Sequence, residues 1–567
     1  MRDNPMTPMR STYKKICAQM VRLTVLLALA GCGGSNNNDD PANGGSSCGS
    51  GPTGTGATVA ITGHLQYEDK TYNQNGFTGA TAMKPIRFAA VQVVRSCDEA
   101  VLNSASDASD ANGDYTVTFT NTDTAGVYIR VLASAPPWQI RIMQPPNLLW
   151  ALASNPIDDT GAAPFTMDLT AGLDSGGGVF NLLDVMTSGA EFVNALSGAL
   201  PPLTVNWSPG SCDGTYFSPA DNGIFVLGGC TDGDTDEYDD PVLLHEFGHF
   251  ANSVYSRDDS PGGIHFLNSN DQDIRLSWSE GWGNFFSSAV RNDPLYVDTV
   301  GSAAIISVNL EDLSNGMGID LAADAIYSTN EISVAVVLWD IFDNTPTEPL
   351  ATAAATDALA AGMTPIWDVI SHYVFTCTGC NVSIEDFWDG WFNCPTCTTV
   401  NHESPTEMAA LIADRKISFK LDSREPDNDA ASAPDCPLLP CTSSHTLYTA
   451  GDLDYVKFTA TAGASYTIQT SRLSNGADTF LEVLDTNGTT VLMSNDDATA
   501  VTKNSTCGVN FVTQQSNCPP NDATTLSSKV VFTPTAGGTY YVRVKHAPAA
   551  PPSAGLYGSY DLKITSP

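Results

Sequence analysis

The stretch Pro241-Val-Leu-Leu-His245-Glu246-Phe247-Gly248-His249-Phe250-Ala251 carries the pattern H-E-x-x-H in a setting that predicts a helix. Asp240 followed by Pro241 is the N-cap and first-turn pairing expected where a helix begins. On that helix His245 and His249 lie four residues apart and project from one face, so both imidazoles can bind a single metal ion. Glu246 falls on a neighbouring face, close to the ion. The sequence therefore predicts a metal site carried by a helix.

An acidic segment, Asp232–Asp240, comes directly before this helix and packs six carboxylates into nine residues. Asp232, Asp234 and Asp236 alternate like the start of a calcium-binding loop. An EF-hand also requires a bidentate Glu at its twelfth position, where this chain has Leu243. We therefore reject an EF-hand and interpret the segment mainly as the approach to the helix.

A catalytic zinc site needs three protein ligands, with the fourth position left to water. The candidate for the third is Glu280, within Leu276-Ser-Trp-Ser-Glu280-Gly-Trp-Gly-Asn284-Phe-Phe-Ser, which is predicted to form a second helix. Two antiparallel helices at this separation can meet over one ion. The alternative is that Glu280 merely faces solvent.

The H-E-x-x-H pattern followed by Glu280-Gly-Trp resembles the gluzincin metallopeptidases, the thermolysin-like fold group. The downstream segment Asn330–Asp340 is also similar to the fungalysin branch of that group. The likeness covers roughly residues 178–417. It implies that His245, His249 and Glu280 bind zinc, and that Glu246 acts as the general base.

The resemblance also implies a Tyr or His that stabilises the tetrahedral oxyanion. Tyr327, His372 and His265 are the candidates, and of these we take Tyr327. In the family an Asp usually follows the third ligand by four residues and bonds to a zinc-binding histidine, whereas this chain has Asn284. A neutral amide raises the basicity of the histidine less than a carboxylate does, which predicts weaker support for the zinc site.

The N-terminus predicts export from the cytoplasm. Residues 1–31 combine basic residues with an apolar run, and Leu29-Ala30-Gly31-Cys32 resembles the lipobox of bacterial lipoproteins, which implies that Cys32 is lipidated and anchors the chain at the outer membrane or cell surface. An ordinary cleaved secretory signal is the alternative. No later stretch is long enough to span a bilayer. Residues 32–57, rich in Gly, Ser and Asn, are predicted to be a flexible linker.

The cysteines indicate disulfides, because twelve remain after Cys17 and Cys32 and the predicted compartment is oxidising. Three local pairs are expected. Apart from the four motif cysteines described next, this leaves Cys48 and Cys97. The spacing C-x2-C-x13-C-x2-C fits either two nested disulfides or a structural zinc site. The oxidising compartment favours the disulfides. The residues concerned are the expected pairs Cys212 with Cys230, Cys436 with Cys441 and Cys507 with Cys518, and the motif cysteines Cys377, Cys380, Cys394 and Cys397.

The predicted fold is multidomain. Residues 58–172 show short alternating strands and resemble a carboxypeptidase regulatory-like β-sandwich. Residues 173–417 form the expected α+β metallopeptidase domain with a mostly helical C-terminal lobe, and Gly223–Gly228 within it is either an edge strand that pairs with substrate or a core strand. After a predicted linker, 418–444, residues 445–567 resemble a bacterial pre-peptidase C-terminal domain, a jelly-roll-like β-sandwich. Its candidate calcium ligands, for which turn roles are the alternative, are Asp478, Asp496 and Asp497.

Charge narrows the choice of partner. A formal net charge of −38 disfavours nucleic acid and would attract a cationic peptide. The leading hypothesis is a secreted or surface-attached, monomeric zinc endopeptidase that cuts extracellular proteins and touches the membrane only through its lipid. The competing hypothesis is a non-catalytic surface binding protein with a degenerate site, and a third directs the hydrolase to glycoproteins or peptidoglycan peptides. The presence of Glu246 argues against the non-catalytic binding protein, since an inactive protein has no chemical need for this carboxylate.

Overall fold

The computed structural model describes residues 54–122, 126–157, 161–230, 233–270, 272–311, 325–343, 359–376, 382–398, 405–417, 419, 422–448, 451–475, 477–496, 509–510, 515–516, 526–548 and 557–566. The chain forms two compact units. The first comprises Met1–Tyr67, Pro85–Ala133 and Trp150–Gly177, and the second comprises Glu68–Lys84, Ser134–Leu149 and Gly178–Pro567. The H-E-x-x-H helix lies in the second unit.

The first unit is built from strands. The first part of β1 (Thr58–Asn73) pairs antiparallel with β4 (Asp114–Thr120) and parallel with β10 (Phe165–Thr166) and β11 (Leu169–Ala171). A further sheet has the order β3 (Val91–Arg95), β5 (Val127–Leu132), β9 (Ala151–Ala153). Buried and exposed residues alternate strictly along β4, which is the pattern of a strand with one face on a core. The alternating runs of the sequence therefore do form sheets here.

The boundary of the first unit differs from the predicted one at residue 172. Segments Glu68–Lys84 and Ser134–Leu149 belong to the second unit instead. The first contains most of β2 (Gly76–Pro85), which pairs with β16 (Ala303–Asn309), and the second contains β7 (Ile140–Gln144), which pairs parallel with β12 (Leu203–Asn206). These pairings join residues far apart in sequence, and local patterning does not reveal them.

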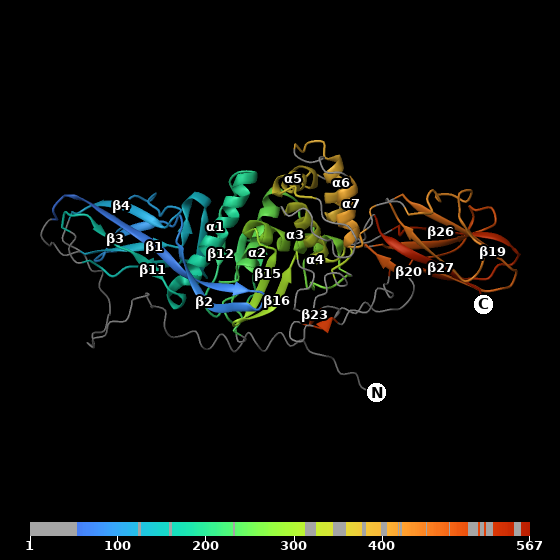
Figure 1. Cartoon of the computed structure of the whole chain (residues 1–567), viewed down its shortest axis with the longest axis horizontal. Helices are drawn as coiled ribbons and strands as arrows, with labels where there is room; N and C mark the ends of the chain where they lie inside the picture. The colour runs from blue at the N-terminus through green and yellow to red at the C-terminus, as the bar shows by residue number, and fades with distance from the viewer. Residues whose placement is uncertain are drawn as a thin grey trace, which may run out of the picture. The chain divides into compact units, whose positions relative to one another are not determined.

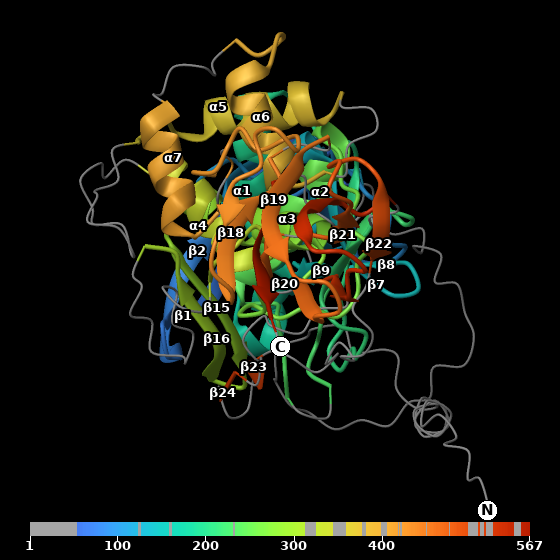
Figure 2. The same cartoon turned by 90° about the vertical axis from the view of Figure 1, so that its right-hand side faces the viewer.

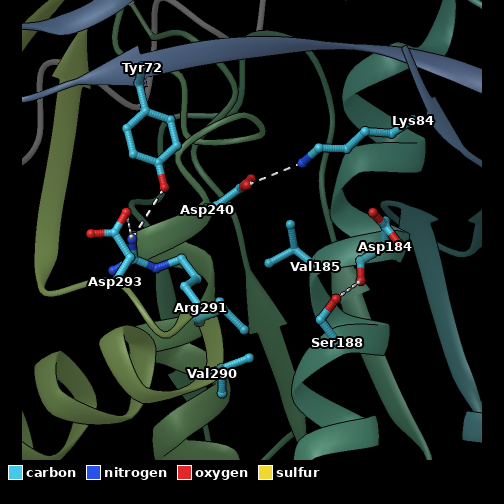
Figure 3. Close-up of a pocket in the computed structure, with 10 residues that line it drawn as sticks. Tyr72, Lys84, Asp184, Val185, Ser188, Asp240, Val290, Arg291 and Asp293 are labelled. Carbon is cyan, nitrogen blue, oxygen red and sulfur yellow. Dashed lines mark hydrogen bonds and ion pairs between the residues drawn. The ribbon is translucent and has the colours of Figure 1, made fainter. Parts of the chain in front are cut away.

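Side-chain contacts also tie Glu68–Lys84 to the second unit. Lys84 Nζ lies 2.7 Å from Asp69 Oδ2 and 3.7 Å from Asp240 Oδ2. Arg291 Nη1 donates to the Tyr72 hydroxyl at 3.3 Å. A polar pocket is lined by Tyr72, Lys84, Asp240 and Arg291 among others, and in it Lys84 points toward Asp240 and Tyr72 toward Arg291 (Figure 3). None of the predicted zinc ligands lines this pocket.

The second unit has a central mixed sheet with the order β13 (Tyr216–Ser218), β14 (Gly223–Phe225), β12, β7, β6 (Ser134–Ala135), with β8 (Leu148–Leu149) paired to β7. The strand predicted around Gly223–Gly228 is therefore interior, because β13 pairs on its outer side. The edge strand is β13. β15 (Leu295–Val300) follows the second motif helix and pairs antiparallel with β16, which joins it to β2 in another sheet.

Helices form the rest of the central region, as the sequence predicted. α3 packs against both α2 and α4, and the three lie together in both views (Figures 1 and 2). The helices are α1 (Gly178–Leu196), α2 (Asp240–Tyr255), α3 (Ile274–Arg291), α4 (Glu331–Phe342), α5 (Met363–Asp368), α6 (Ile384–Asn393) and α7 (Pro405–Asp414), with a 3-10 turn η4 (Pro136–Trp138) and the π-helical segments η5 (Leu173–Gly177) and η6 (Val369–Val374).

Side-chain caps begin several of these helices. The Asp273 side chain accepts from Arg275 N at the start of α3, and Asn330 accepts from Ser333 N at the start of α4. The cap of α2 is Asp239 rather than the predicted Asp240, which is the first helical residue. The Asp239 carboxylate makes no cap bond and instead accepts from the backbone N–H of Thr299 at 3.1 Å, because β15 lies beside the helix start.

The C-terminal strands form a β-sandwich, drawn in orange to red in Figure 1, which confirms that part of the predicted fold. Apolar side chains of both sheets meet in one core, among them Phe458, Val542 and Ile564. One sheet has the order β17 (Asp435–Cys436), β19 (Leu453–Ala460), β26 (Gly538–His546), β21 (Thr479–Leu484), β22 (Val491–Asn495), and the other β18 (Cys441–Thr446), β27 (Ser559–Thr565), β20 (Tyr466–Ser474), β25 (Lys529–Phe532). The short strands β23 (Val509–Asn510) and β24 (Gln515–Ser516) pair with each other.

The prediction of a linker at residues 418–444 is partly wrong. β17 and most of β18 lie inside it, and Tyr455 N donates to the Asp427 carbonyl at 3.0 Å. The acidic and Pro-rich composition suggested a spacer, but the backbone of this segment is paired with strands of the sandwich. The sandwich therefore begins earlier than residue 445.

Disulfides join Cys212 to Cys230 and Cys436 to Cys441, and Cys97 is also disulfide-bonded. Cys394 bonds to Cys397, so the predicted nested pairing is wrong for these two: only two residues separate them, which lets them bond locally. This bond also removes both from any zinc site. Seven further cysteines lie outside the described residues, namely Cys17, Cys32, Cys48, Cys377, Cys380, Cys507 and Cys518. Within the described part of the chain, none of the helices has the length and apolar character to cross a membrane.

Candidate metal centre

Helices α2 and α3 bring His245, His249 and Glu280 together. His245 Nε2 lies 3.2 Å from Glu280 Oε2, and His249 Nε2 lies 3.0 Å from His245 Nε2 and 3.7 Å from Glu280 Oε2. One ligand atom from each residue thus falls within 4.8 Å of the others. Two imidazole nitrogens and a carboxylate oxygen are the donor set of a catalytic zinc site.

Gly283 explains how α3 approaches His245 so closely. A Cβ atom at this position would lie 2.7 Å from His245 Cε1 and 2.8 Å from both ring nitrogens. A glycine inside a helix costs about 1 kcal/mol relative to alanine. Gly281, two residues earlier, similarly leaves room for Val334 of α4. The two glycines of the Glu280-Gly-Trp-Gly segment therefore let α3 pack tightly between its neighbours.

Asn284 occupies the place expected for a supporting residue. Its Oδ1 lies 3.0 Å from His245 Nδ1, and it is buried. When Asn284 Oδ1 accepts from Nδ1–H, the Nε2 atom of His245 is left to face His249 and Glu280. His249 has a different support, since its Nδ1 lies 3.4 Å from Ser279 Oγ, which donates to Asp258 Oδ2 at 2.6 Å. Asp258 and Ser279 escaped the sequence analysis because no motif marks them.

Electrostatics favour an ionised carboxylate at Glu280. Burial alone would raise the pKa of Glu280, but hydrogen bonds from His245 and His249 hold the pKa well below its usual range. Burial alone would lower the pKa of His249, whereas the hydrogen bond and charge of Glu280 raise the pKa to about 9. An ionised carboxylate that draws positive charge to this point is suited to a bound cation.

Glu246 is buried next to these ligands, with 9% of its surface exposed. Its Oε2 accepts from the backbone N–H of Phe217 at 2.7 Å, which belongs to the edge strand β13. Burial raises the pKa of Glu246 above the ordinary range for Glu. A carboxylate whose pKa moves toward neutrality is better matched to proton transfer near pH 7.

His265 lies at the site, whereas Tyr327 and His372 have other partners. His265 Nε2 is 3.6 Å from Glu280 Oε2, and its Nδ1 is 2.8 Å from Glu331 Oε2. Glu331 is fully buried. Burial alone would lower the pKa of His265, but Glu331 raises the pKa to about 10. The sequence had marked His265 as a candidate without a motif to prefer it.

Tyr327 makes no hydrogen bond to His245, Glu246, His249 or Glu280 among the described residues; its backbone N–H donates to the Arg415 carbonyl at 2.7 Å. This backbone bond does not place the Tyr327 side chain, so its role in stabilising the oxyanion stays a prediction. His372 is half exposed, and its Nδ1 lies 2.8 Å from Oδ1 of Asp368, the last residue of α5. A missed residue is Tyr296 of β15, whose ring lies 6.1 Å from that of His245.

Other groups of potential metal ligands occur elsewhere in the described residues. One joins Asp234 and Asp236 to Asp298. Two more lie at the C-terminal sandwich and share Asp454, with Asp422 and His445 in one and Glu425 and Asp427 in the other. Neither Asp478 nor Asp496 belongs to any such group in the described part of the chain, and Asp497 lies outside it.

Comparison with known proteins gives two family matches. Residues 195–364 match the family described as "Mycolysin C-terminal domain", and residues 452–546 match "Bacterial pre-peptidase C-terminal domain". The first range contains all of α2 and α3. No curated protein matches this sequence significantly.

Two solved structures resemble about a quarter of the chain. The pre-peptidase C-terminal domain of a collagenase from Bacillus anthracis is 13% identical, with 24% of this chain and 94% of that chain covered and a TM-score of 0.16. PliG, a periplasmic inhibitor of g-type lysozyme from Aeromonas hydrophila, is 10% identical, with 24% and 97% covered and a TM-score of 0.13. At such TM-scores neither likeness bears on function. The family matches, in contrast, support a metallopeptidase of the thermolysin-like type that carries a pre-peptidase C-terminal domain.

Proposed function

We propose that this protein is a zinc-dependent endopeptidase. The observation that carries the proposal is the convergence of His245 Nε2, His249 Nε2 and Glu280 Oε2, with the Glu246 carboxylate on the same helix. Among first-row metals this mixture of imidazole and carboxylate ligands suits zinc, and three ligands leave a position open for water. The residues present therefore fit the metal that the family matches suggest.

A metal in this position supplies Lewis acidity and brings the pKa of water toward neutrality. The chain's own groups do the rest. Glu246 takes a proton from the attacking water and passes it to the leaving amine. His265, held at Nδ1 by Glu331, presents its Nε2 side to the site and donates to the developing oxyanion. We therefore propose His265 for this role.

The edge strand β13 is the proposed platform for substrate. An extended peptide can add to a free sheet edge, and among the described strands β13 pairs with β14 alone. Phe217 of this strand donates its N–H to Glu246, so the strand lies directly at the catalytic base. A peptide aligned along β13 would pass beside the metal ligands. The expected substrate is a protein or peptide outside the cytoplasm.

The competing hypothesis, a non-catalytic binding protein, is not favoured by the peptidase family matches. Burial of the Glu246 carboxylate also costs desolvation free energy, and an inactive protein would gain no function in return. We propose that the enzyme acts as a monomer and that Cys32, which lies outside the described residues, anchors it to the membrane. Domains of the secreted peptidase type support an extracytoplasmic location.

The direct test is metal analysis together with a proteolysis assay on the full mature protein. We expect one zinc per chain and cleavage of an unfolded protein such as casein. A zinc chelator should abolish the cleavage, and added zinc should restore it. Protein that binds no zinc after refolding in its presence, or that carries zinc and cleaves nothing, would contradict the proposal.

His265→Phe is expected to lower kcat by about 100-fold, because one oxyanion donor is lost. Zinc content and KM should change little, since the imidazole of His265 is not among the three ligands. The ring of Phe retains most of the packing volume. His372→Phe is the matched control and should retain full kcat. Equal kcat values for the two variants would remove His265 from the mechanism.

A further inference from the structure

The C-terminal sandwich makes a buried contact with the segment that precedes α4. Asn475 directly follows β20, and its Oδ1 accepts from the Ser328 backbone N–H at 3.0 Å and from the Ser328 hydroxyl at 3.2 Å. Its Nδ2 donates to the Lys416 carbonyl at 3.4 Å. Ser328 is 0% and Asn475 1% exposed, so water does not compete for these bonds. One amide of the sandwich therefore binds two segments of the helical region.

The backbone around this contact adopts an unusual conformation. The φ angle is 71° at Tyr327, 56° at Lys416 and 55° at Asn475, all in the left-handed region. Asn tolerates this region, but a bulky residue such as Tyr stays there only where the surrounding contacts hold it. The Tyr327 N–H donates to the Arg415 carbonyl at 2.7 Å, and Asn475 holds the next residue, Ser328. The sandwich thus supplies one of the contacts that fix this turn.

The segment 326–331, which contains this contact, also holds the loop residues 265–270. The Thr329 hydroxyl donates to the Asn270 carbonyl at 2.8 Å. The Asn330 side-chain amide donates to two more backbone carbonyls of the loop, at 3.2 and 3.1 Å. Because Asn330 is fully buried, these bonds have no competition from water. The position of the loop therefore follows that of the segment.

His265 lies at one end of this network. Its Nδ1 is 2.8 Å from Oε2 of Glu331, the first residue of α4. The same carboxylate oxygen accepts from Gln272 Nε2 at 3.4 Å, and Gln272 Oε1 accepts from Phe266 N at 2.8 Å. Both the ring of His265 and the backbone of the next residue are thus tied to the start of α4. Only three positions separate Glu331 from Ser328.

We propose that Asn475 is a positioning residue of the peptidase, which holds His265 in place through Ser328 and Glu331. The inference rests on the proposed function, in which His265 donates to the oxyanion. It makes the C-terminal sandwich a working part of the enzyme rather than an independent attachment. Loss of the Asn475 side chain releases Ser328, allows Tyr327 to leave the left-handed region and displaces Glu331 together with His265.

Asn475→Gly in the full zinc-loaded protein is the test, because glycine retains the left-handed backbone and removes only the side chain. It should lower kcat by about tenfold, with zinc content and KM little changed, because a small displacement of a catalytic group is costly. Asn475→Asp should recover most of the wild-type kcat, since a carboxylate still accepts from both donors of Ser328. Combined with His265→Phe, Asn475→Gly should lower kcat no further, because the two residues act through one group.

Asn487→Gly is the matched control, since Asn487 belongs to the same sandwich and bonds within its own turn. It should retain the wild-type kcat. Full kcat in Asn475→Gly beside an impaired His265→Phe would overturn the inference and leave the proposed function standing. A further loss of kcat in the double variant would also overturn it, because Asn475 would then act by another route.

Amide hydrogen exchange gives a second readout that requires neither substrate nor activity. Exchange at Ser328 and at residues 265–270 should be at least about tenfold faster in Asn475→Gly than in the wild type, and close to wild type in Asn475→Asp. Ser328→Ala loses one of the two bonds to Asn475, should show a smaller change of the same kind, and replaces Asn475→Gly if that variant does not fold. Unchanged exchange would overturn the inference. A wild-type protein without zinc or peptidase activity would instead contradict the proposed function, while exchange still decides whether Asn475 holds the segment.

Discussion

Glu246→Gln is expected to lower kcat/KM for peptide hydrolysis by about 10²–10⁴-fold while zinc stays at one per chain. The amide cannot accept a proton from water or return it to the leaving amine. Gln retains the length of Glu, and its carbonyl oxygen can still accept from Phe217 N, which now bonds to Glu246 Oε2 at 2.7 Å. The change therefore removes the base without dismantling its surroundings.

The measurement is a steady-state peptidase assay, accompanied by metal analysis and thermal unfolding of each variant. Glu191→Gln on α1 makes the same chemical change away from the site and serves as the control. It should match the wild type. A Glu246→Gln variant that retains wild-type turnover with bound zinc would exclude the general-base mechanism. Loss of zinc in this variant would instead make Glu246 a contributor to metal binding.

Glu280→Ala should abolish stoichiometric zinc binding, and peptidase activity with it. The two histidines of α2 would remain, but the only anionic ligand would be gone. Changes in groups that merely support a ligand cost about 10–100-fold in affinity, so loss of a ligand itself should cost more. The fold should survive, because Glu280 lies between polar groups and is 14% exposed rather than part of the apolar core.

Zinc affinity by competition with a chromophoric chelator provides the readout for this variant. Glu407→Ala on α7 is the control and should bind zinc as the wild type does. Thermal unfolding in excess chelator should be similar for all three proteins, which separates metal loss from unfolding. Wild-type zinc affinity in Glu280→Ala would mean that another residue is the third ligand.

The candidate ligands show which parts of the metal site can be predicted from local sequence. The four-residue spacing of His245 and His249 requires only that α2 be a helix, and the turn geometry then places both rings on one face. Glu280 required the further assumption that a second helix packs against the first. Gly283 makes that packing possible, although the lack of room for a Cβ atom beside the His245 ring can be recognised only in three dimensions.

Residues that act through non-local contacts were harder to predict. His265 carried no motif, and its position depends on Glu331, which follows sixty-six residues later and begins α4. The strand at Gly223–Phe225 was left open between edge and core, and pairing with β13 makes it interior. In each case the deciding contact joins segments that sequence periodicity treats as independent.

The sequence by itself determined the local chemistry: a helix with two histidines and a glutamate, a second helix with a third ligand, and alternating strands at both ends. These follow from residue spacing within single elements, because helical and strand periods are set by the backbone. Tertiary structure alone decided that the hairpin Glu68–Lys84 joins the helical unit, that Cys394 bonds to Cys397, and that Asp298 meets Asp234 and Asp236. Such contacts depend on how distant segments pack. Many residues contribute to their free energy, so no single motif predicts them.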